Sequence, residues 1–201
     1  RSVVESQRLI AEAEKRNLVI MVDHTFVYTP AVRKIRELIA SDQLGEIYYY
    51  DSTRVNLGLF QSDVNVIWDL AVHDMSILEY ILDQKPTAVS AGGTRHIVGR
   101  PENIAHVTLY YDCGTIAHIN ANWLAPAKIR QTLIGGSKKM IVYNDLEPSE
   151  KIKLYDRGVD LHGMAQQIEA AHLRQLHVTD DDAAQFGRDK AERLLGRGAG
   201  L

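Results

Sequence analysis

The chain has 201 residues, of which 45% are hydrophobic and 24% are charged, and its formal net charge is −3. This length fits one large domain, or one domain and part of another, and no apolar run approaches the roughly 18 residues that cross a membrane. The charge gives no basic field, so neither nucleic acid nor a membrane is an expected partner. The single cysteine, Cys113, excludes an internal disulfide and, with no signal peptide visible, favours a cytoplasmic protein.

The first 24 residues have the pattern of a helix followed by a strand. Residues 2–16 carry apolar side chains at the helical period among polar ones, and Asn17 ends the run. The segment from Leu18 to Val22 is short, apolar and β-branched, which predicts a buried strand. Because one strand cannot form a sheet, we expect the other strands of this α/β unit to lie outside the chain.

Three longer elements are predicted next. Pro30 begins a helix that runs to about Ala40, with Thr29 as its N-cap. Residues 46–56 are rich in aromatic and β-branched side chains and predict a long strand. Residues 66–82 place apolar side chains at helical spacing and predict a strongly buried helix.

Four or five strands follow this helix, at residues 87–96, 105–111, 115–123, 129–134 and 140–143. Turn signals at residues 112–114 and 135–138 suit tight hairpins. All nine tyrosines precede residue 157, whereas the last 45 residues contain one aromatic side chain, Phe186. We therefore expect residues 157–201 to be an atypical tail that is partly helical or mobile.

Asp69 and His73 are the most informative pair of polar residues. Four positions apart on a helix, they share one face, where their side chains can converge on one substrate atom. A carboxylate beside an imidazole suits proton transfer from an alcohol, because the imidazole titrates near neutral pH and the carboxylate raises its proton affinity. The same spacing also suits a structural hydrogen bond or a cap. Asp74, a third polar residue on these first turns of an otherwise apolar helix, favours a site.

Four segments carry a resemblance to a known family: the helix–strand entry EAEKRNLVIMVDHT, the run FVYTP before a helix, LGEI before a long strand, and WDLAVHD at the start of the buried helix. In this order and spacing, residues 11–82 resemble the second half of the Gfo/Idh/MocA oxidoreductase family. The resemblance implies a Rossmann domain that binds NAD or NADP, followed by an α+β domain of the dihydrodipicolinate-reductase-like C-terminal type. That domain has an open mixed, largely antiparallel sheet with helices on one face. Residues 1–24 would then be a remnant of the Rossmann domain, and residues 25–156 the substrate-binding and oligomerisation domain.

The resemblance also implies roles for individual residues. By position, His73 resembles the family's general acid/base, and Asp69 resembles the carboxylate one helical turn earlier that assists it. The family's third member, a lysine in a Glu-Lys-Pro motif, would lie just before Ser2 and is not in this sequence, nor is the glycine-rich phosphate loop. The resemblance implies an oxidoreductase that moves a hydride between nicotinamide and a sugar, nucleotide sugar or cyclitol, and the chain alone is expected to be inactive.

Five further residues are weaker candidates. Arg54 and Asn56 alternate along the end of the long strand and could bind a polyol, although a solvated strand face explains them equally well. Tyr28 and Trp68 could pack against the sugar or the nicotinamide, although such aromatic residues are more often core. We assign Tyr28 to the substrate, and Trp68 and His24 to the cofactor, with a structural role for His24 as the alternative.

His96, His106 and His118 lie on neighbouring predicted strands and raise the question of a metal. They lack cysteine or carboxylate partners at ligand spacing, and the family resemblance implies no metal, so we expect surface or core roles and no metal site.

Two other interpretations remain open beside the oxidoreductase. The chain could be a non-catalytic sugar-binding or oligomerisation module that lacks the cofactor domain, or its first helix and strand could complete a split cofactor domain in another chain. In each case an apolar sheet face left open to water favours self-association, so a homo-oligomer through that face is expected.

Overall fold

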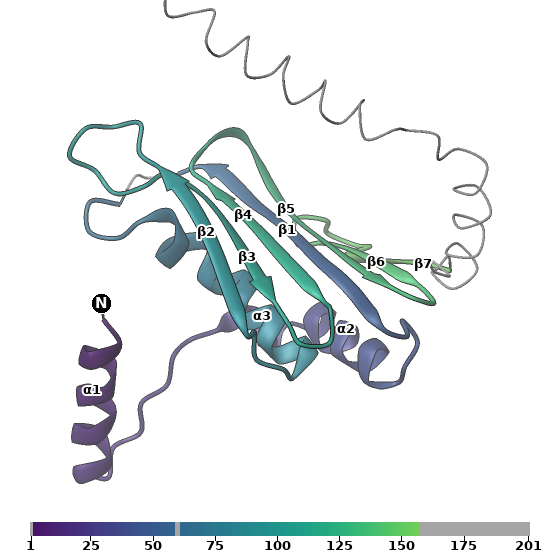
Figure 1. Ribbon diagram of the computed structural model, residues 1–201, viewed down its shortest axis with the longest axis horizontal. Helices are drawn as coiled ribbons and strands as arrows, with labels where there is room; N and C mark the ends of the chain where they lie inside the picture. Colours follow the sequence, from purple (N-terminus) through teal and green to yellow (C-terminus); the bar gives the residue numbers. More distant parts are fainter. Residues whose placement is uncertain (1, 59–60, 157–201) are drawn as a thin grey trace, which may run out of the picture. The chain divides into compact units, whose positions relative to one another are not determined.

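The computed structural model describes residues 2–58 and 61–156, so the predicted tail at 157–201 lies outside the described residues (Figure 1). The N-terminal part contains the helix α1 (Val3–Lys15), the 3-10 turn η1 (Thr25–Tyr28), the helix α2 (Pro30–Ala40), the strand β1 (Ile47–Leu57), the π-helical turn η2 (Ile67–Ala71) and the helix α3 (Val72–Leu82). Six strands follow: β2 (Ala88–Thr94), β3 (Ile104–Tyr110), β4 (Ile116–Asn122), β5 (Leu124–Gly136), β6 (Met140–Asn144) and β7 (Ile152–Tyr155). No helix in these ranges combines the length and the apolar character needed to cross a bilayer.

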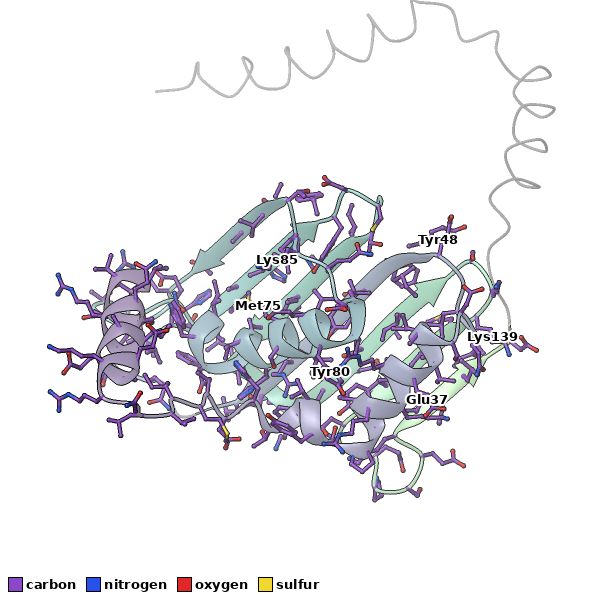
Figure 2. The ribbon with its side chains drawn as sticks, turned by 90° about the horizontal axis from the view of Figure 1, so that it is seen from below. Glu37, Tyr48, Met75, Tyr80, Lys85 and Lys139 are labelled. Atoms are coloured by element: carbon purple, nitrogen blue, oxygen red, sulfur yellow. The ribbon has the colours of Figure 1, made fainter. Side chains whose placement is uncertain are left out.

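The seven strands form one open sheet in the order β2-β3-β4-β1-β5-β6-β7. Only β1 and β4 run parallel, and every other pair of neighbours in this sheet is antiparallel. The helices α2 and α3 cover one face of the sheet, which is clearest from below in Figure 2, where Glu37 marks α2 and Tyr80 marks α3. The predicted α+β class, with a mixed and largely antiparallel sheet, is therefore confirmed.

The hydrophobic core lies between the two helices and the face of the sheet that they cover. Side chains alternate across a pleated strand, so every second residue of β4 is buried there, from Ala117 through Ile119 to Ala121. Val32 of α2 and Ile77 of α3 pack into the same cluster with less than 2% exposure. This packing fixes the beginning of α3 over the middle strands.

The opposite face of the sheet carries large side chains, and none of the described helices covers it. Tyr49, Ile116 and Tyr110 are direct cross-strand neighbours on β1, β4 and β3, and each is between 37% and 45% exposed. The next row places Asp51 opposite His118, with 3.4 Å between Oδ1 and Nδ1. We call these five residues the open face.

The N-terminal segment differs from its prediction. The first helix forms as α1, with the Ser2 hydroxyl accepting a hydrogen bond from the amide of Glu5. The buried strand expected from Leu18 to Val22 is wrong, because this segment has no regular secondary structure and its side chains are 49% to 93% exposed. A strand needs a neighbour for its backbone hydrogen bonds, and no described strand pairs with it.

Two further differences concern the rest of the chain. The helix expected over residues 66–82 begins instead with the π turn η2, and only Val72 to Leu82 is α-helical. The edge strand β7 has no counterpart in the prediction, because its four residues are too few for a pattern to stand out. The predicted turn at 112–114 is confirmed by the left-handed Gly114 before β4, whereas the turn predicted at 135–138 comes later, at 137–139, because Gly135 and Gly136 still belong to β5.

A buried ion pair joins α3 to the centre of the sheet. Arg54 of β1 donates from Nε to Oδ2 of Asp74 at 2.6 Å and from Nη2 to Oδ1 at 3.3 Å, and the side chains are 3% and 2% exposed. The hydroxyl of Tyr50 also donates to the backbone carbonyl of Asp74, at 3.5 Å. Burial, followed by the charge of Asp74, raises the pKa of Tyr50 well above its ordinary value, which keeps this hydroxyl protonated as a donor.

Substituting Asp74→Asn should destabilise the domain by about 3–5 kcal/mol, because it leaves the guanidinium of Arg54 buried without a counter-charge. Urea unfolding followed by circular dichroism measures this loss. Asp51→Asn is the matched control, since its partner His118 and Asp51 itself are both exposed, and it should cost no more than about 1 kcal/mol. Equal midpoints for the two variants would contradict the importance of the buried pair.

Gly136→Ala should also destabilise the fold, because an added Cβ would lie 2.2 Å from the backbone oxygen of Leu44, which cannot move aside as a side chain could. Overpacking of this kind costs about 1–3 kcal/mol. Gly92→Ala in β2 meets nothing within 4 Å and should leave the melting temperature unchanged or slightly raised. Differential scanning calorimetry of the two variants decides between strain at Gly136 and a general intolerance of alanine in the strands.

Candidate active site

The site is built around the place where η2 becomes α3. Backbone hydrogen bonds in a π turn join residues five positions apart, whereas those in an α-helix join residues four apart. Residues four positions apart across a π turn therefore no longer lie directly above one another. Asp69 belongs to the π turn, whereas His73 lies in the first turn of α3. The amide of Trp68 donates to the side-chain oxygen of Asn65 at 3.3 Å, which caps the beginning of the turn. Single π turns of this kind occur frequently at functional sites.

His73 is half-buried, and its ring packs edge-on against Phe26 with 5.0 Å between the ring centroids. Its Nδ1 atom is buried and has no hydrogen-bond partner among the residues that the structure describes. Burial, and then the positive charge of Arg54, lower the pKa of His73 below its ordinary value. At neutral pH the imidazole is therefore uncharged, which leaves one ring nitrogen free to accept a proton.

Asp69 does not hydrogen-bond to His73 in this structure. Its Oδ2 atom accepts a hydrogen bond from Nε1 of Trp123 at 2.8 Å. The carboxylate still acts on the imidazole through space, since its charge is among the influences that raise the pKa of His73 and oppose the effect of burial. The two residues predicted to converge are thus neighbours in the site, but the π turn directs the carboxylate to the indole.

The two residues assigned to the substrate on β1 have different environments. Arg54 is 3% exposed and donates to Asp74 from Nε and Nη2, whereas its Nη1 atom is buried and has no hydrogen-bond partner among the described residues. Asn56, two positions further along β1, is half-buried near the end of the strand. A solvated strand face, the other explanation considered for Arg54, is excluded by its burial.

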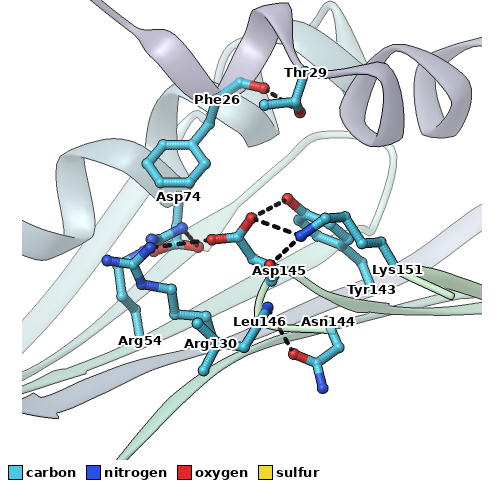
Figure 3. Close-up of polar contacts among 10 residues, drawn as sticks. All are labelled: Phe26, Thr29, Arg54, Asp74, Arg130, Tyr143, Asn144, Asp145, Leu146 and Lys151. Carbon is cyan, nitrogen blue, oxygen red and sulfur yellow. Dashed lines mark hydrogen bonds and ion pairs between the residues drawn. The ribbon is translucent and has the colours of Figure 1, made fainter. Parts of the chain in front are cut away.

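Phe26 connects more groups of the site than any residue singled out from the sequence. The guanidinium carbon of Arg54 lies 4.6 Å from the centroid of its ring, and that of Arg130 lies 5.8 Å away. Arg54 and Arg130 are direct cross-strand partners on β1 and β5, beneath the ring in Figure 3. Like charges placed opposite each other in a sheet are destabilising. A carboxylate partner for each guanidinium and the cation–π contact with the Phe26 ring offset this repulsion.

Asp145 is the carboxylate that balances Arg130. Nη1 of Arg130 donates to its Oδ2 at 3.1 Å, and the hydroxyl of Tyr143 donates to its Oδ1 at 3.2 Å. Lys151 donates to the backbone oxygen of Asp145, and its ammonium lies 3.8 Å from Oδ1 (Figure 3). Burial and the adjacent carboxylate raise the pKa of Tyr143, so this hydroxyl remains protonated.

Sequence reasoning missed Phe26 as a contact of His73, and Arg130 with its partners. A single arginine on a strand carries no distinguishing signal, because its importance comes from the residue opposite it in the sheet. The register that places Arg130 beside Arg54 depends on the pairing of β1 with β5, strands that are far apart in the chain.

Three aromatic or imidazole candidates lie around this centre. Trp68 is 62% exposed on the π turn beside Asp69, and Tyr28 is 56% exposed at the end of η1, with the guanidinium of Arg33 6.0 Å from its ring centroid. His24 is half-buried immediately before η1. A core role for Tyr28 and Trp68 is therefore excluded, and their side chains are accessible.

The three histidines on the predicted strands do not converge. Nδ1 of His96 lies 2.9 Å from the side-chain oxygen of Asn103, whereas His106 and His118 stack with 5.8 Å between ring centroids. His118 has a carboxylate neighbour, Asp51, that spacing along the chain did not reveal. Within the described ranges, no three histidine, cysteine or carboxylate side chains are grouped so that they could hold a metal ion.

Comparison with known proteins places this geometry in context. The sequence profile of the GFO/IDH/MocA C-terminal domain matches residues 32–142. The UDP-N-acetylglucosamine 3-dehydrogenase of Acidithiobacillus ferrooxidans is 26% identical over 155 residues, which cover 77% of this chain and 47% of that enzyme. The chain thus spans about half the length of the curated relative that it matches.

Solved structures share the fold. The structure of the same Acidithiobacillus enzyme has a TM-score of 0.63 at 23% identity and aligns with 76% of this chain and 48% of its own. An inositol dehydrogenase homologue from Azotobacter vinelandii, solved with NADH and myo-inositol, has a TM-score of 0.66 at 17% identity, with coverages of 80% and 48%. The WlbA dehydrogenase of Bordetella pertussis, solved with NADH and UDP-GlcNAcA, has a TM-score of 0.65 at 14% identity, with coverages of 75% and 50%.

The matched profile extends from α2 into β6 and includes Arg54, the π turn and His73. It covers more than half of the chain, and its fold agrees with the sheet described above. The chain therefore belongs to the Gfo/Idh/MocA oxidoreductase family and carries that family's C-terminal domain.

Proposed function

We propose that this chain is the substrate-binding and catalytic part of a cytoplasmic NAD(P)-dependent oxidoreductase that acts on a hydroxyl of a sugar, nucleotide sugar or cyclitol. Family membership and the dehydrogenase names of the relatives support the reaction class. Residues 1–24 correspond to the end of the dinucleotide-binding domain, and residues 25–156 to the substrate domain. The chain spans about half the length of these relatives, and activity would require a dinucleotide-binding domain together with the domain described here.

The observation that carries this proposal is the state of His73. Its imidazole is held neutral by burial and by neighbouring positive charge, and its Nδ1 atom has no partner within the described structure. A half-buried neutral imidazole with an unpaired Nδ1 in the described structure is suited to take a proton from a substrate hydroxyl during oxidation and to return it during reduction. Asp69 stabilises the imidazolium through space, and Trp123 fixes the position of that carboxylate.

The residues present fit the nicotinamide end of a dinucleotide. The indole of Trp68 is exposed beside Asp69, and His24 lies just ahead of η1, whose Phe26 contacts His73. Trp68 and His24 would hold the nicotinamide, while Tyr28 and Asn56 bind and orient the substrate. The cofactor supplies the hydride acceptor in oxidation and the donor in reduction.

The open face supports a second role for the same domain. Tyr49, Ile116 and Tyr110 form a row of large exposed side chains on the side of the sheet that no described helix covers. Such a surface suits pairing with a second copy, so we propose a homo-oligomer formed through it. A sugar-binding or oligomerisation module without catalysis is the alternative that this observation favours.

The first test is the proton affinity of His73. Followed by NMR, its ring protons should titrate with a midpoint below the ordinary pKa of 6.5, because burial and Arg54 disfavour the charged form. Asp69→Asn should move the midpoint further down, since it removes a negative charge that raises the pKa. Asp51→Asn on the open face should leave it unchanged. A midpoint at or above 6.5 would argue against a neutral base.

The second test supplies a cofactor domain from a relative. The N-terminal half of the Acidithiobacillus enzyme fused ahead of residue 25 should reduce NAD or NADP with at least one of UDP-N-acetylglucosamine, other nucleotide sugars or myo-inositol. His73→Ala in this fusion should lower kcat by about 10²–10⁴-fold, the usual contribution of a general acid or base. His96→Ala is the control for loss of a histidine and should keep full activity. A fusion that binds substrate but reduces no cofactor would favour the non-catalytic module.

A further inference from the structure

Trp123 is held firmly at the junction of β4 and β5. Its side chain is 1% exposed, and its backbone amide donates to the carbonyl of Asn103 at 3.0 Å. Its own carbonyl accepts from the amide of Gly58 at 3.2 Å, and a Cβ added at Gly58 would lie 3.1 Å from Cδ1 of the indole. The indole therefore has little freedom to move, and its N–H is a donor in a fixed place.

The acceptor of this donor is the carboxylate that precedes His73 by four positions. Nε1 of Trp123 lies 2.8 Å from Oδ2 of Asp69. A hydrogen bond to an ionised carboxylate is roughly twice as strong as one between neutral groups. The other carboxylate beside the imidazole, Asp74, is held instead by the cation Arg54. The two carboxylates of the site thus differ in their partners, because one is bound by a charge and the other by a neutral N–H.

The charges that face His73 are balanced in number. Four charged side chains act on its imidazole: Arg54 of β1, Arg130 of β5, Asp74 of α3 and Asp69 of η2. η1 contributes the uncharged ring of Phe26. Burial lowers the pKa of His73 most, followed by the charge of Arg54, and Arg130 acts in the same direction, whereas the two carboxylates raise it. With two charges of each sign, a movement of one carboxylate toward the imidazole is enough to change its protonation.

We propose that Trp123 is a positioning residue for the reaction: its indole N–H holds the carboxylate of Asp69 away from His73 and so preserves the imidazole as a proton acceptor. This inference rests on the proposed role of His73 as the base. Without the N–H, the carboxylate would be free to turn toward the imidazole, and a charge-assisted contact between them would favour the imidazolium. An imidazolium has no acceptor nitrogen and could not take the proton of a substrate hydroxyl.

This restraint on Asp69 has opposite effects on the two directions of the reaction. Oxidation needs the neutral imidazole, so its rate falls as the pH drops through the pKa of His73. Reduction needs the protonated imidazole, so its rate falls as the pH rises through the same pKa. A carboxylate held at the indole keeps this pKa low, and Trp123 therefore favours proton acceptance, and with it oxidation, at neutral pH.

Replacement of the indole N–H tests this inference on the chain itself. In Trp123→Phe, the ring protons of His73 followed by NMR should titrate with a midpoint about 1 pH unit higher than in the unaltered chain, because the carboxylate is released. Trp68→Phe is the matched control: it removes the exposed indole next to Asp69 in the π turn and should leave the midpoint unchanged.

A second replacement separates the N–H from the packing of the buried ring. Benzothienylalanine has the shape of tryptophan with sulfur in place of the N–H. Incorporated at position 123 in the Trp68→Phe background, it should raise the midpoint of His73 as Trp123→Phe does. Circular dichroism checks that each protein is folded.

A double substitution shows whether Trp123 acts through Asp69. Asp69→Asn removes the charge that the indole holds, so adding Trp123→Phe to it should cause no further change in the midpoint of His73. In the fusion with a cofactor domain, Trp123→Phe should move the acid limb of the kcat/KM profile for oxidation upward by about the same 1 pH unit.

The outcomes separate this inference from the proposed function. An upward shift with both replacements at position 123 that disappears in the Asp69→Asn background supports it. An unchanged or lower midpoint, or the same upward shift when Asp69 is already Asn, would overturn the role of Trp123 and leave His73 as the base. Full activity of His73→Ala in the fusion would instead overturn the base, and with it this inference, whatever the titrations give.

Discussion

The ion pair between Arg54 and Asp74 is the constraint on which the site depends. It joins the central strand β1 to the first turn of α3, where both side chains are almost completely buried. Removing either partner would leave the other charge buried and unpaired. Because Asp74 follows His73 directly, the pair also fixes where the imidazole stands above the sheet. The same arginine sets the electrostatic field of the site, being the strongest charge that acts on His73. The ion pair between Arg54 and Asp74 therefore influences both the position and the proton affinity of His73.

The charged groups around His73 have opposite effects on its pKa. Positive charges from Arg54 and Arg130 lower the proton affinity of His73, and negative charges from Asp74 and Asp69 raise it. Phe26 allows this arrangement, since its ring faces accept the two guanidiniums while its contact with His73 leaves the imidazole half-buried. An imidazole poised between such influences responds strongly to any further charge in its surroundings.

Much of the fold could be predicted from the sequence, and the exceptions have physical causes. Periodicity along a single element located α2, β1 and most of α3, because burial of one face leaves a regular pattern. The run from Leu18 to Val22 has the same local pattern as a buried strand, but strand formation needs a partner that no described residue supplies. The prediction of Asp69 beside His73 assumed α-helical spacing, which the π turn alters. Arg130 acquires its importance only through the register between β1 and β5, and no local pattern encodes that register.

The order of the strands has a consequence for how the domain assembles. β2, β3 and β4 form one antiparallel meander and β5, β6 and β7 form another, so each can pair locally as the chain emerges. β1 is made first, yet its neighbours are β4 and β5, from which it is separated by α3 and two strands. Its two neighbours in the sheet lie at residues 116–136, so β1 can pair with both of them only after about two thirds of the chain has been made. The strand that carries Arg54 therefore joins the two meanders, and the site depends on pairing between parts of the chain that are far apart in sequence.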